Sequence, residues 1–492
     1  MKQALEQTGM KRELGLLDST MIVAGSMIGS GIFIVTSDIA RSVGSPGYIL
    51  LIWLITGFIT LIAALSYGEL AGMMPKAGGQ YIYLREAYNP LIGFLFGWTV
   101  FTVIQTGVIA AVAIAFAKFT GVLLPDIISD KIILADLGFI KFNTQQLLAI
   151  ALIAFLTYVN LQGVKNAKII QTTFTLAKIV SLLGLIVLGI YFGLNGQALA
   201  GNMVDFWKPF KTIGNADGTI STEALSGIVL WGAVGAAMVG SLFSSDAWNN
   251  ITYTAGEVKD PQRNIPLSLF FGTLIVTILY VMANVAYMML LPVMGTPGGE
   301  DVLSRGIMFA TDDRVGTAAV ATIFGSLAVI IMAILIMIST FGCNNGLILS
   351  GARLYYAMAK DAVFFQKAGT LNKNNVPGFA LIIQGFWSSL LCLTGTYGDL
   401  LDYCTFSSLL FYMVTIIGLF ILRKTRPDAE RPYKAFGYPV LPALYVVIAG
   451  AICVNLLIYK PTTCGTGLLI VLLGVPVYYL WKYVGKKNNS VK

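Results

Sequence analysis

The segment GSMIGSGIFI, residues 25–34, lies inside a long apolar run that should cross a membrane as a helix. Between Gly25 and Gly31 it places three glycines and two serines in seven positions. A glycine in a helix interior is about 1 kcal/mol less favourable than alanine, and serine competes for backbone hydrogen bonds. The sequence therefore predicts that this helix is interrupted within the bilayer.

Apolar residues are in excess along the whole chain. Of its 492 residues, 57% are hydrophobic and 11% are charged, whereas about a quarter of the residues of a soluble protein are charged. Apolar runs of 18 residues or more can cross a bilayer. We therefore expect an all-α integral membrane protein with twelve transmembrane helices, near residues 16–43, 47–74, 88–120, 144–162, 165–194, 223–256, 265–292, 315–358, 377–397, 400–422, 438–458 and 465–484.

The distribution of basic residues predicts how the chain is oriented in the membrane. If the twelve spans are threaded in order, 22 of the 32 lysines and arginines fall on the side of the N-terminus and nine on the other side. Cytoplasmic loops carry the excess of Lys and Arg. We therefore expect a cell membrane protein (plasma or inner membrane) with both termini in the cytoplasm. The net charge of +8 then reflects orientation, and no nucleic-acid partner is expected.

Residue types that are missing exclude several kinds of chemistry. The chain has no histidine, and its five cysteines include no Cys-x-x-Cys pair, so neither a metal site nor a disulfide framework is expected. It contains no catalytic nucleophile motif and no filter sequence repeated by symmetry, as a channel would need. We expect no cofactor and no enzymatic activity. A sensor that binds its ligand without transporting it is a further alternative.

The sixth predicted span contains a second interruption, SSDAWNN at residues 244–250. An aspartate among serines and asparagines is unfavourable at membrane depth unless it lines a cavity. Spans 1 and 6 are five helices apart, and an odd offset reverses the orientation, as an inverted repeat requires. Each interruption alone also fits helix packing, because Gly25 and Gly29 form a GxxxG pattern. Two breaks at matching places favour a binding site.

Broken helices expose backbone groups that suit a zwitterion. The half-helix after a break begins with amides that favour a carboxylate, and the half-helix before it ends in carbonyls that favour an ammonium. An α-amino acid matches both ends. The expected donors and acceptors are the amides of Gly29, Ser30 and Gly31 and the carbonyls of Met27, Phe243 and Asp246.

Motifs along the chain carry a resemblance to a known family. GSMIGSGIF is similar to the first-helix signature of the amino acid–polyamine–organocation (APC) superfamily. From about Leu14 to the C-terminus, the chain resembles the L-type amino acid transporter (LAT) family of this superfamily. The motifs that carry this resemblance are FSSDAWNN followed by GEVKDPQRNIP (256–266), YGELAGMMPKAGGQYIY (67–83), STFGCNNGLILSGARLYYAMAKD (339–361) and RPYKAFGYPVLP (431–442).

The resemblance implies a LeuT-like fold, with two inverted five-helix repeats, unwound helices 1 and 6, and two further helices, 11 and 12. It also implies sodium-independent exchange of small or large neutral L-amino acids by alternating access. The alternatives are a proton-coupled amino acid or amine permease and a cationic amino acid permease. The expected boundaries within one transmembrane domain, 1–492, are an N-terminal tail 1–13, repeats 14–195 and 222–424, helices 11 and 12 at 436–485, and a C-terminal tail 486–492.

Carried over residue by residue, the resemblance places the substrate carboxylate on Ser30 and Gly31 and the amine on the three carbonyls named above. Tyr280 matches a seventh-helix tyrosine that lies near the substrate in relatives. The expected substrate-binding residues are Met27, Ile28, Gly29, Ser30, Gly31, Phe243, Ser244, Ser245, Asp246 and Tyr280.

The chain departs from the family pattern in two places. Ser245 and Ala247 stand where many relatives have tyrosine or glycine, which leaves the side-chain preference open. The loop 121–143 lacks the cysteine by which animal relatives bind a heavy chain. We therefore expect the bacterial type, with amino acid substrates and the lipid bilayer as partners and no disulfide-linked heavy chain.

Lys178 is the one basic residue expected deep in the membrane. It follows Lys165 by 13 residues, or about 20 Å along a helix, which is too deep for its ammonium to reach the interface. A functional role is then the first hypothesis, and a structural lysine satisfied by carbonyls is the alternative. The resemblance implies that it replaces a sodium ion beside Gly25 and Ser339, Thr340 or Asn344. Because a desolvated lysine can titrate, proton coupling also stays open.

Other charged residues allow more than one interpretation. Asp246 could bind a cationic side chain, or it could orient the substrate amine, and we favour neutral substrates. Glu69 and Glu257 are expected to be gate or packing charges, with Arg353 or Lys76 as partners. Asp18 is expected to cap the first helix.

Overall fold

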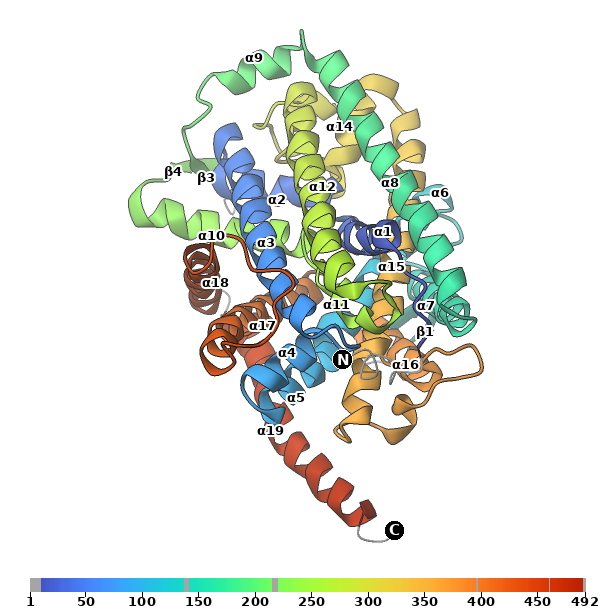
Figure 1. Ribbon diagram of the computed structural model, residues 1–492. Helices are drawn as coiled ribbons and strands as arrows, with labels where there is room; N and C mark the ends of the chain where they lie inside the picture. The colour runs from blue at the N-terminus through green and yellow to red at the C-terminus, as the bar shows by residue number, and fades with distance from the viewer. Residues whose placement is uncertain (1–9, 137–140, 215–219, 395–396, 460, 490–492) are drawn as a thin grey trace.

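The computed structural model describes residues 10–136, 141–214, 220–394, 397–459 and 461–489. Within this part of the chain, ten helices are long and apolar enough to cross a membrane. Figure 1 shows them as one helical bundle. The chain is therefore a helical membrane protein, as its composition predicts. The expected tails 1–13 and 486–492 fall partly on residues 1–9 and 490–492, which lie outside the described residues.

The elements of the first half run from α1 to β4. Their bounds are α1 Leu16–Met27, η2 Gly31–Phe33, α2 Val35–Val43, α3 Pro46–Met73, α4 Gln80–Ala87, α5 Pro90–Thr99, η3 Val100–Ile104, α6 Gln105–Leu123, β1 Ile133–Asp136, β2 Lys141–Asn143, α7 Thr144–Leu161, α8 Val164–Gly193, α9 Gln197–Met203, β3 Phe210–Gly214 and β4 Ile220–Ala224.

The second half has helices and no named strand among its described residues. Its elements are α10 Gly227–Ser244, α11 Asn250–Tyr253, η4 Ala255–Glu257, α12 Pro261–Leu290, α13 Val302–Arg305, η5 Thr311–Asp313, α14 Val315–Phe324, α15 Leu327–Lys360, η6 Gln366–Gly369, α16 Gly378–Thr394, α17 Tyr397–Thr425, α18 Val440–Tyr459 and α19 Pro461–Asn489.

The run expected as one span at 315–358 is two helices. α14 ends at Phe324 and α15 begins at Leu327. Between them Gly325 has φ +57° and ψ −133°, a positive-φ conformation that glycine adopts without strain. The apolar composition continues through this turn, so hydropathy alone hid the boundary.

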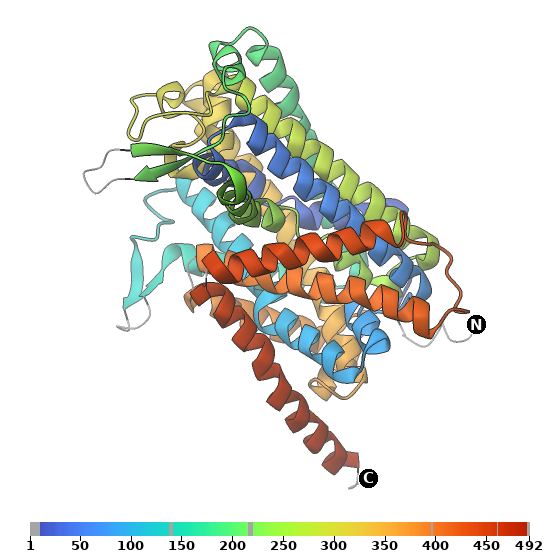
Figure 2. The ribbon, with the colours of Figure 1, turned by 90° about the vertical axis from the view of Figure 1, so that its left-hand side faces the viewer.

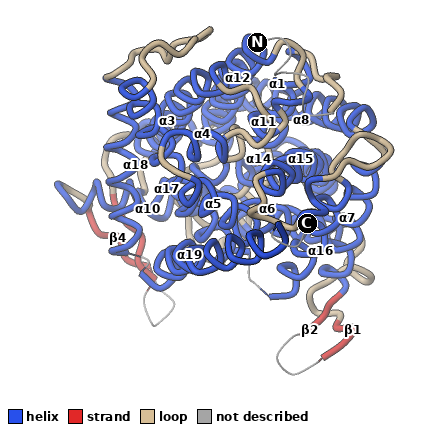
Figure 3. The backbone as a smooth tube through the Cα atoms, turned by 60° about the horizontal axis from the view of Figure 1, so that its bottom comes forward, coloured by secondary structure: helices blue, strands red, loops and turns tan. Residues whose placement is uncertain are grey.

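Two short hairpins depart from the all-α expectation. β1 pairs with β2, and β3 pairs with β4, both antiparallel. Figure 3 shows the strands at the periphery of the molecule, outside the helical body. They belong to connections outside the candidate membrane spans.

The long helices pack around the interrupted segments. α12 packs against α1, α3 and α8, and α15 packs against α1, α6 and α8. α10 packs against α2 and α3, and α17 packs against α18 and α19. Figures 1 and 2 both show the end of α19 running away from the rest of the bundle. The break between α1 and α2 is therefore enclosed by long helices from both halves of the chain.

The close approach of α12 to α1 at Gly272 gives a test of this packing. A Cβ on Gly272 would lie 2.4 Å from Val23 Cγ1, and a β-branched side chain has little freedom to move away. We expect Gly272→Leu to destabilise the protein by about 1–3 kcal/mol, as overpacking usually does.

The matched control is Gly184→Leu on α8, where a Cβ meets nothing within 4 Å. Helix propensity rises equally in both variants, so their difference in thermal unfolding temperature reports packing alone. Equal unfolding temperatures would contradict the contact.

Candidate functional site

The first break lies between α1 and η2. α1 ends at Met27, and Ile28 leaves the helix with φ −76° and ψ 99° while its N–H still donates to Ala24 O at 3.0 Å. Beyond it, Gly29 and Ser30 form a bend before η2. The last carbonyls of a helix have no intrahelical donor, so this break leaves the carbonyl end of α1 in need of partners.

Side chains from three other helices bind these carbonyls. Cys343 Sγ on α15 lies 3.1 Å from Ser26 O. Ser339 Oγ, also on α15, donates to Ile28 O at 3.2 Å and to Gly29 O at 3.0 Å. Lys178 from α8 and Tyr280 from α12 bind the others, so the unwound segment is held by α8, α12 and α15.

The Lys178 ammonium lies at the centre of this arrangement. The residue is only 3% exposed. Its Nζ donates to Gly25 O at 2.8 Å, Ile28 O at 2.7 Å and Ser339 O at 3.0 Å. An ammonium has three hydrogens, and all three have an acceptor here. Lys178 thus joins α8 to the end of α1 and to α15 through backbone oxygens.

Two of the expected neighbours of Lys178 have other partners. Thr340 Oγ1 donates to Ile336 O at 2.8 Å within α15. The Asn344 amide faces Ile109 and Ala113 of α6, at 3.1 and 3.2 Å. Of the three α15 residues, the structure places only Ser339 on the ammonium, and it does so through its backbone carbonyl.

The second break lies between α10 and α11. α10 ends at Ser244, and the amide of Asp246 donates to Phe243 O at 3.1 Å. Ala247 then has φ +65°. This left-handed conformation costs a residue with a Cβ about 1–2 kcal/mol, so the break stores backbone strain at Ala247.

The two breaks are in contact with each other. A Cβ on Gly31 would lie 2.1 Å from Ser244 Oγ, so only glycine permits this approach. Tyr280 Oη lies 3.1 Å from Met27 O and 3.0 Å from Ser244 O. A phenol has one hydrogen, so it can donate to only one of these carbonyls at a time. Met27, Gly31, Ser244 and Tyr280, all predicted from sequence, therefore meet at one place.

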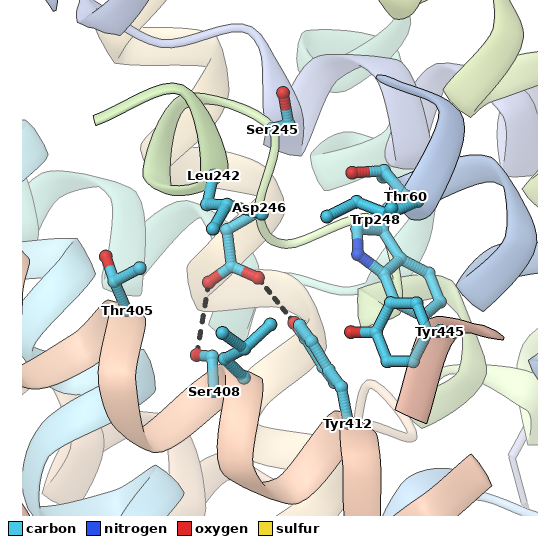
Figure 4. A pocket seen from close by; sticks show the side chains of 11 residues that line it. Thr60, Leu242, Ser245, Asp246, Trp248, Thr405, Ser408, Tyr412 and Tyr445 are labelled. Atoms are coloured by element: carbon cyan, nitrogen blue, oxygen red, sulfur yellow. Dashed lines mark hydrogen bonds between the residues drawn. The ribbon is translucent and has the colours of Figure 1, made fainter. Parts of the chain in front are cut away.

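The Asp246 side chain extends toward α17. Its carboxylate accepts from Tyr412 Oη at 2.5 Å and from Ser408 Oγ at 3.2 Å (Figure 4). Tyr412 Oη also lies 3.2 Å from Asn249 Oδ1. Within the described residues, no lysine or arginine forms an ion pair with Asp246. The carboxyl group of Asp246 is held by hydroxyl groups.

The space around Asp246 is too small for an amino acid. One cavity of about 20 Å³ is lined by Asp246, Ser245 and Trp248 among others, and a second of about 10 Å³ lies on the side of Asn249 and Tyr253. One water needs about 10–15 Å³ by this measure. The structure is thus a closed conformation, and admitting a larger ligand requires these helices to move apart.

Sequence reasoning did not single out Tyr412 and Ser408. They lie four residues apart on α17, on one face of the helix, among apolar neighbours. Paired polar residues at this spacing in an apolar helix were the available signal. The hydrogen-bond partner of these two side chains depends on how α17 is rotated about its axis, and the sequence does not give that rotation.

Two buried glutamates, Glu257 and Glu69, each form ion pairs with arginines. Arg353 and Glu257 pair at 3.0 and 3.1 Å, and neither side chain is exposed. The expectation that Glu69 pairs with Arg353 or Lys76 is wrong: Glu69 binds Arg423 at 2.6 Å and Arg431 at 3.1 Å. These partners come from the end of α17 and the loop after it, far from Glu69 in the sequence.

Asp18 is not the cap residue of the first helix. The N-cap is Gly15, whose N–H donates to Asp18 Oδ2 at 3.0 Å, and Lys168 Nζ donates to the same oxygen at 2.9 Å. Next to it, the amides of Glu13 and Leu14 donate to Glu257 O at 2.9 and 3.0 Å. The start of α1 is thus fastened to the segment after the second break.

The strain at Ala247 gives a test of the second break. We expect Ala247→Gly to be neutral or stabilising, because glycine adopts φ +65° without a steric cost, and the gain offsets the greater freedom of glycine in the unfolded chain.

The control is Ala236→Gly within α10, where glycine should cost about 1 kcal/mol. The unfolded-state effect is the same in both variants, so thermal unfolding should separate them by about 1–2 kcal/mol. If Ala247→Gly lost as much stability as the control, the left-handed conformation would be refuted.

Comparison with known proteins shows to which family this chain with two interrupted helices belongs. A family model described as amino acid permease matches residues 14–479. Large neutral amino acids transporter small subunit 2 of Homo sapiens is 32% identical, over 96% of this chain and 81% of the human protein. The serine/threonine exchanger SteT of Bacillus subtilis (strain 168) is 28% identical, over 96% of this chain and 98% of that protein. The b(0,+)-type amino acid transporter 1 of Mus musculus is 28% identical, over 97% and 90%. The family resemblance drawn from the motifs is confirmed: the chain belongs to the amino acid permease family, as a LAT-type member of the APC superfamily.

Proposed function

We propose that this protein is an amino acid exchanger that works by alternating access. The observation that carries the proposal is the meeting of two interrupted helices, where Tyr280 reaches the carbonyl ends of both. The printed names of the relatives, an amino acid transporter and a serine/threonine exchanger, support transport rather than catalysis.

The fold proposed for this function has twelve crossings in a LeuT-like arrangement. The ten long apolar helices are joined by two further crossings, the α1–α2 pair and α16. Residues 14–195 and 222–424 then form two inverted five-helix repeats, and 436–485 forms helices 11 and 12. The breaks after α1 and α10 begin the two repeats, which supports this division within one transmembrane domain.

In the proposed site the substrate lies between the two breaks. Its carboxylate binds the amides of Ser30 and Gly31, and its amine binds the carbonyls of Met27, Phe243 and Asp246. Ile28, Gly29, Ser244 and Ser245 complete the backbone around it. The Tyr280 hydroxyl lies within hydrogen-bond distance of the Met27 carbonyl in the closed structure, so the amine competes with the hydroxyl for that oxygen.

Lys178 is proposed to do permanently what a sodium ion does in sodium-driven relatives of this fold. Three backbone oxygens at 2.7–3.0 Å around one positive charge are the ligands that a hard cation takes. A fixed ammonium makes the local geometry independent of the ion gradient. The proposal is therefore sodium-independent transport.

Asp246 bears on the choice between neutral and cationic substrates. Its carboxylate already accepts from Tyr412 and Ser408, which supports neutral substrates. The second candidate, a cationic or proton-coupled permease, rests on the lack of a basic partner for Asp246 within the described residues. Arginine competition and an imposed proton gradient separate the two candidates.

The membrane context is also proposed. Both termini lie in the cytoplasm of a cell membrane, in keeping with the excess of basic residues on their side. A disulfide-linked heavy chain is not expected, because all five cysteines are buried and none lies in the loop 121–143.

Uptake of labelled alanine or serine into liposomes tests the exchange. With purified protein in sodium-free buffer and no pH gradient, we expect uptake several-fold greater into vesicles preloaded with unlabelled amino acid than into empty ones. Equal uptake into both would point to a uniporter. Accumulation driven by a proton gradient, or competition by arginine equal to that by serine, would favour the second candidate.

Lys178→Ala tests the role of the ammonium. It removes the ammonium from three buried carbonyls, of which Ile28 O keeps Ser339 Oγ as a donor and Ser339 O lies within α15. A buried carbonyl left unsatisfied costs about 1–3 kcal/mol, so we expect exchange to fall by about 10–100-fold. Lys118→Ala on α6 is the control. Because Lys118 is exposed, this variant should transport normally. Near-normal exchange by a folded Lys178→Ala protein, with thermal unfolding as the check of folding, would refute the role.

A further inference from the structure

A groove of about 980 Å³ opens on the outside of the bundle, between α3, α12 and the loop from α17 to α18. Figures 1 and 2 both show this loop beside one end of α3. The volume is at the upper end of the range of about 300–1,000 Å³ for small-molecule sites. The groove shares no lining residue with the cavities at Asp246, so it belongs to a different site.

The lining combines a long apolar wall with a basic rim. Leu61 and Leu65 of α3 and Leu267 and Phe270 of α12 form the wall, and all four are partly exposed on the outer face of the bundle. An apolar face open to the outside of a membrane protein is in contact with lipid tails. The groove therefore continues into the region occupied by acyl chains.

Two basic side chains line the same groove. Arg263 near the start of α12 and Lys434 in the loop are both exposed. Within the described residues, neither forms an ion pair, whereas the neighbouring Arg423 and Arg431 are paired with Glu69. Asp260 is the one carboxylate in the lining. The groove thus has two basic groups against one acidic group, and its basic groups are not engaged elsewhere.

The loop wall of the groove is fixed in place. Glu69, buried in α3, accepts from the Ala435 amide at 2.7 Å, next to Lys434 in the chain. The Tyr433 ring packs on Gly68, where a Cβ would lie 3.0 Å from the ring. A preformed wall lowers the ordering cost of binding. The backbone is therefore fixed on both sides of Lys434.

We propose that this groove binds one anionic glycerophospholipid, with its phosphate between Arg263 and Lys434 and an acyl chain along Leu61, Leu65, Leu267 and Phe270. Basic pockets between transmembrane helices bind anionic headgroups at the cytoplasmic surface, and the assignment to that leaflet rests on the orientation proposed above. The lipid links α12 to the loop after α17. It is a binding site separate from the one proposed for amino acids.

Native mass spectrometry of the purified full-length protein, in detergent with equal amounts of phosphatidylglycerol and phosphatidylcholine, tests the site. We expect one phosphatidylglycerol to be retained in preference to phosphatidylcholine. The double variant Arg263→Gln/Lys434→Gln should lose about 30-fold in phosphatidylglycerol affinity, which two basic contacts at an anionic membrane surface provide.

The control is Lys367→Gln/Lys373→Gln, which removes the same charge from two other exposed residues and should keep the preference. A second variant, Leu65→Trp, fills the groove with its charges intact and should also reduce retention. Equal loss in the control, no preference in the wild type, or displacement of the lipid by millimolar inorganic phosphate would overturn the proposal. Lipid retention is measured without transport, so it stands or falls separately from the exchange activity.

Discussion

The ammonium of Lys178 satisfies backbone that a membrane cannot otherwise accommodate. Where α1 stops at Met27, its carbonyls lose their helical donors, and the bilayer core supplies no water to replace them. Lys178 binds two of these oxygens and one from α15. One side chain therefore takes part in the break, in the contact of α1 with α8 and in the contact of α1 with α15, and the rest of the site is arranged around it.

Small residues let the helices come close enough for these bonds. A Cβ on Gly25 would lie 2.1 Å from Thr175 Oγ1, and one on Gly346 would lie 2.6 Å from Ser26 Oγ. Gly29, by contrast, has only an ordinary contact, 3.7 Å from Cys343 Sγ. The GxxxG pattern thus has two uses: Gly25 serves packing, and Gly29 keeps the backbone open beside the break. The two interpretations of the pattern are compatible.

The amino-acid composition of short segments predicted the two helix breaks and the depth of Lys178. Glycine and serine between Gly25 and Gly31 located the first break, SSDAWNN located the second, and the distance from Lys165 placed Lys178 deep in the membrane. What the sequence did not predict depends on how helices rotate and meet. Asp246 finds Tyr412 166 residues further along, and Glu69 finds Arg423 354 residues further along.

Helices that are apolar on every side give no periodic signal of which face meets which neighbour. α3 is of this kind, and the polar residues of α17 do not say which helix they meet, so the partners of Glu69 and Asp246 are known only from the structure. The turn at Gly325 was hidden for a related reason, since both helices that flank it are apolar. Most of the long helices were predictable here, and the pairing of their side chains was not.

The hydroxyl of Tyr280 lies near two hydrogen-bond acceptors in the closed site but has only one hydrogen to donate. Two carbonyls, Met27 O and Ser244 O, face the one hydrogen of this phenol, so the phenol serves only one of them at a time. A primary ammonium carries three hydrogens and can remove that shortage while it displaces the phenol. In the proposed exchanger, the two carbonyls therefore have more hydrogen-bond donors when substrate is bound than when it is not. This difference favours a carrier that crosses the membrane with substrate over one that returns without it.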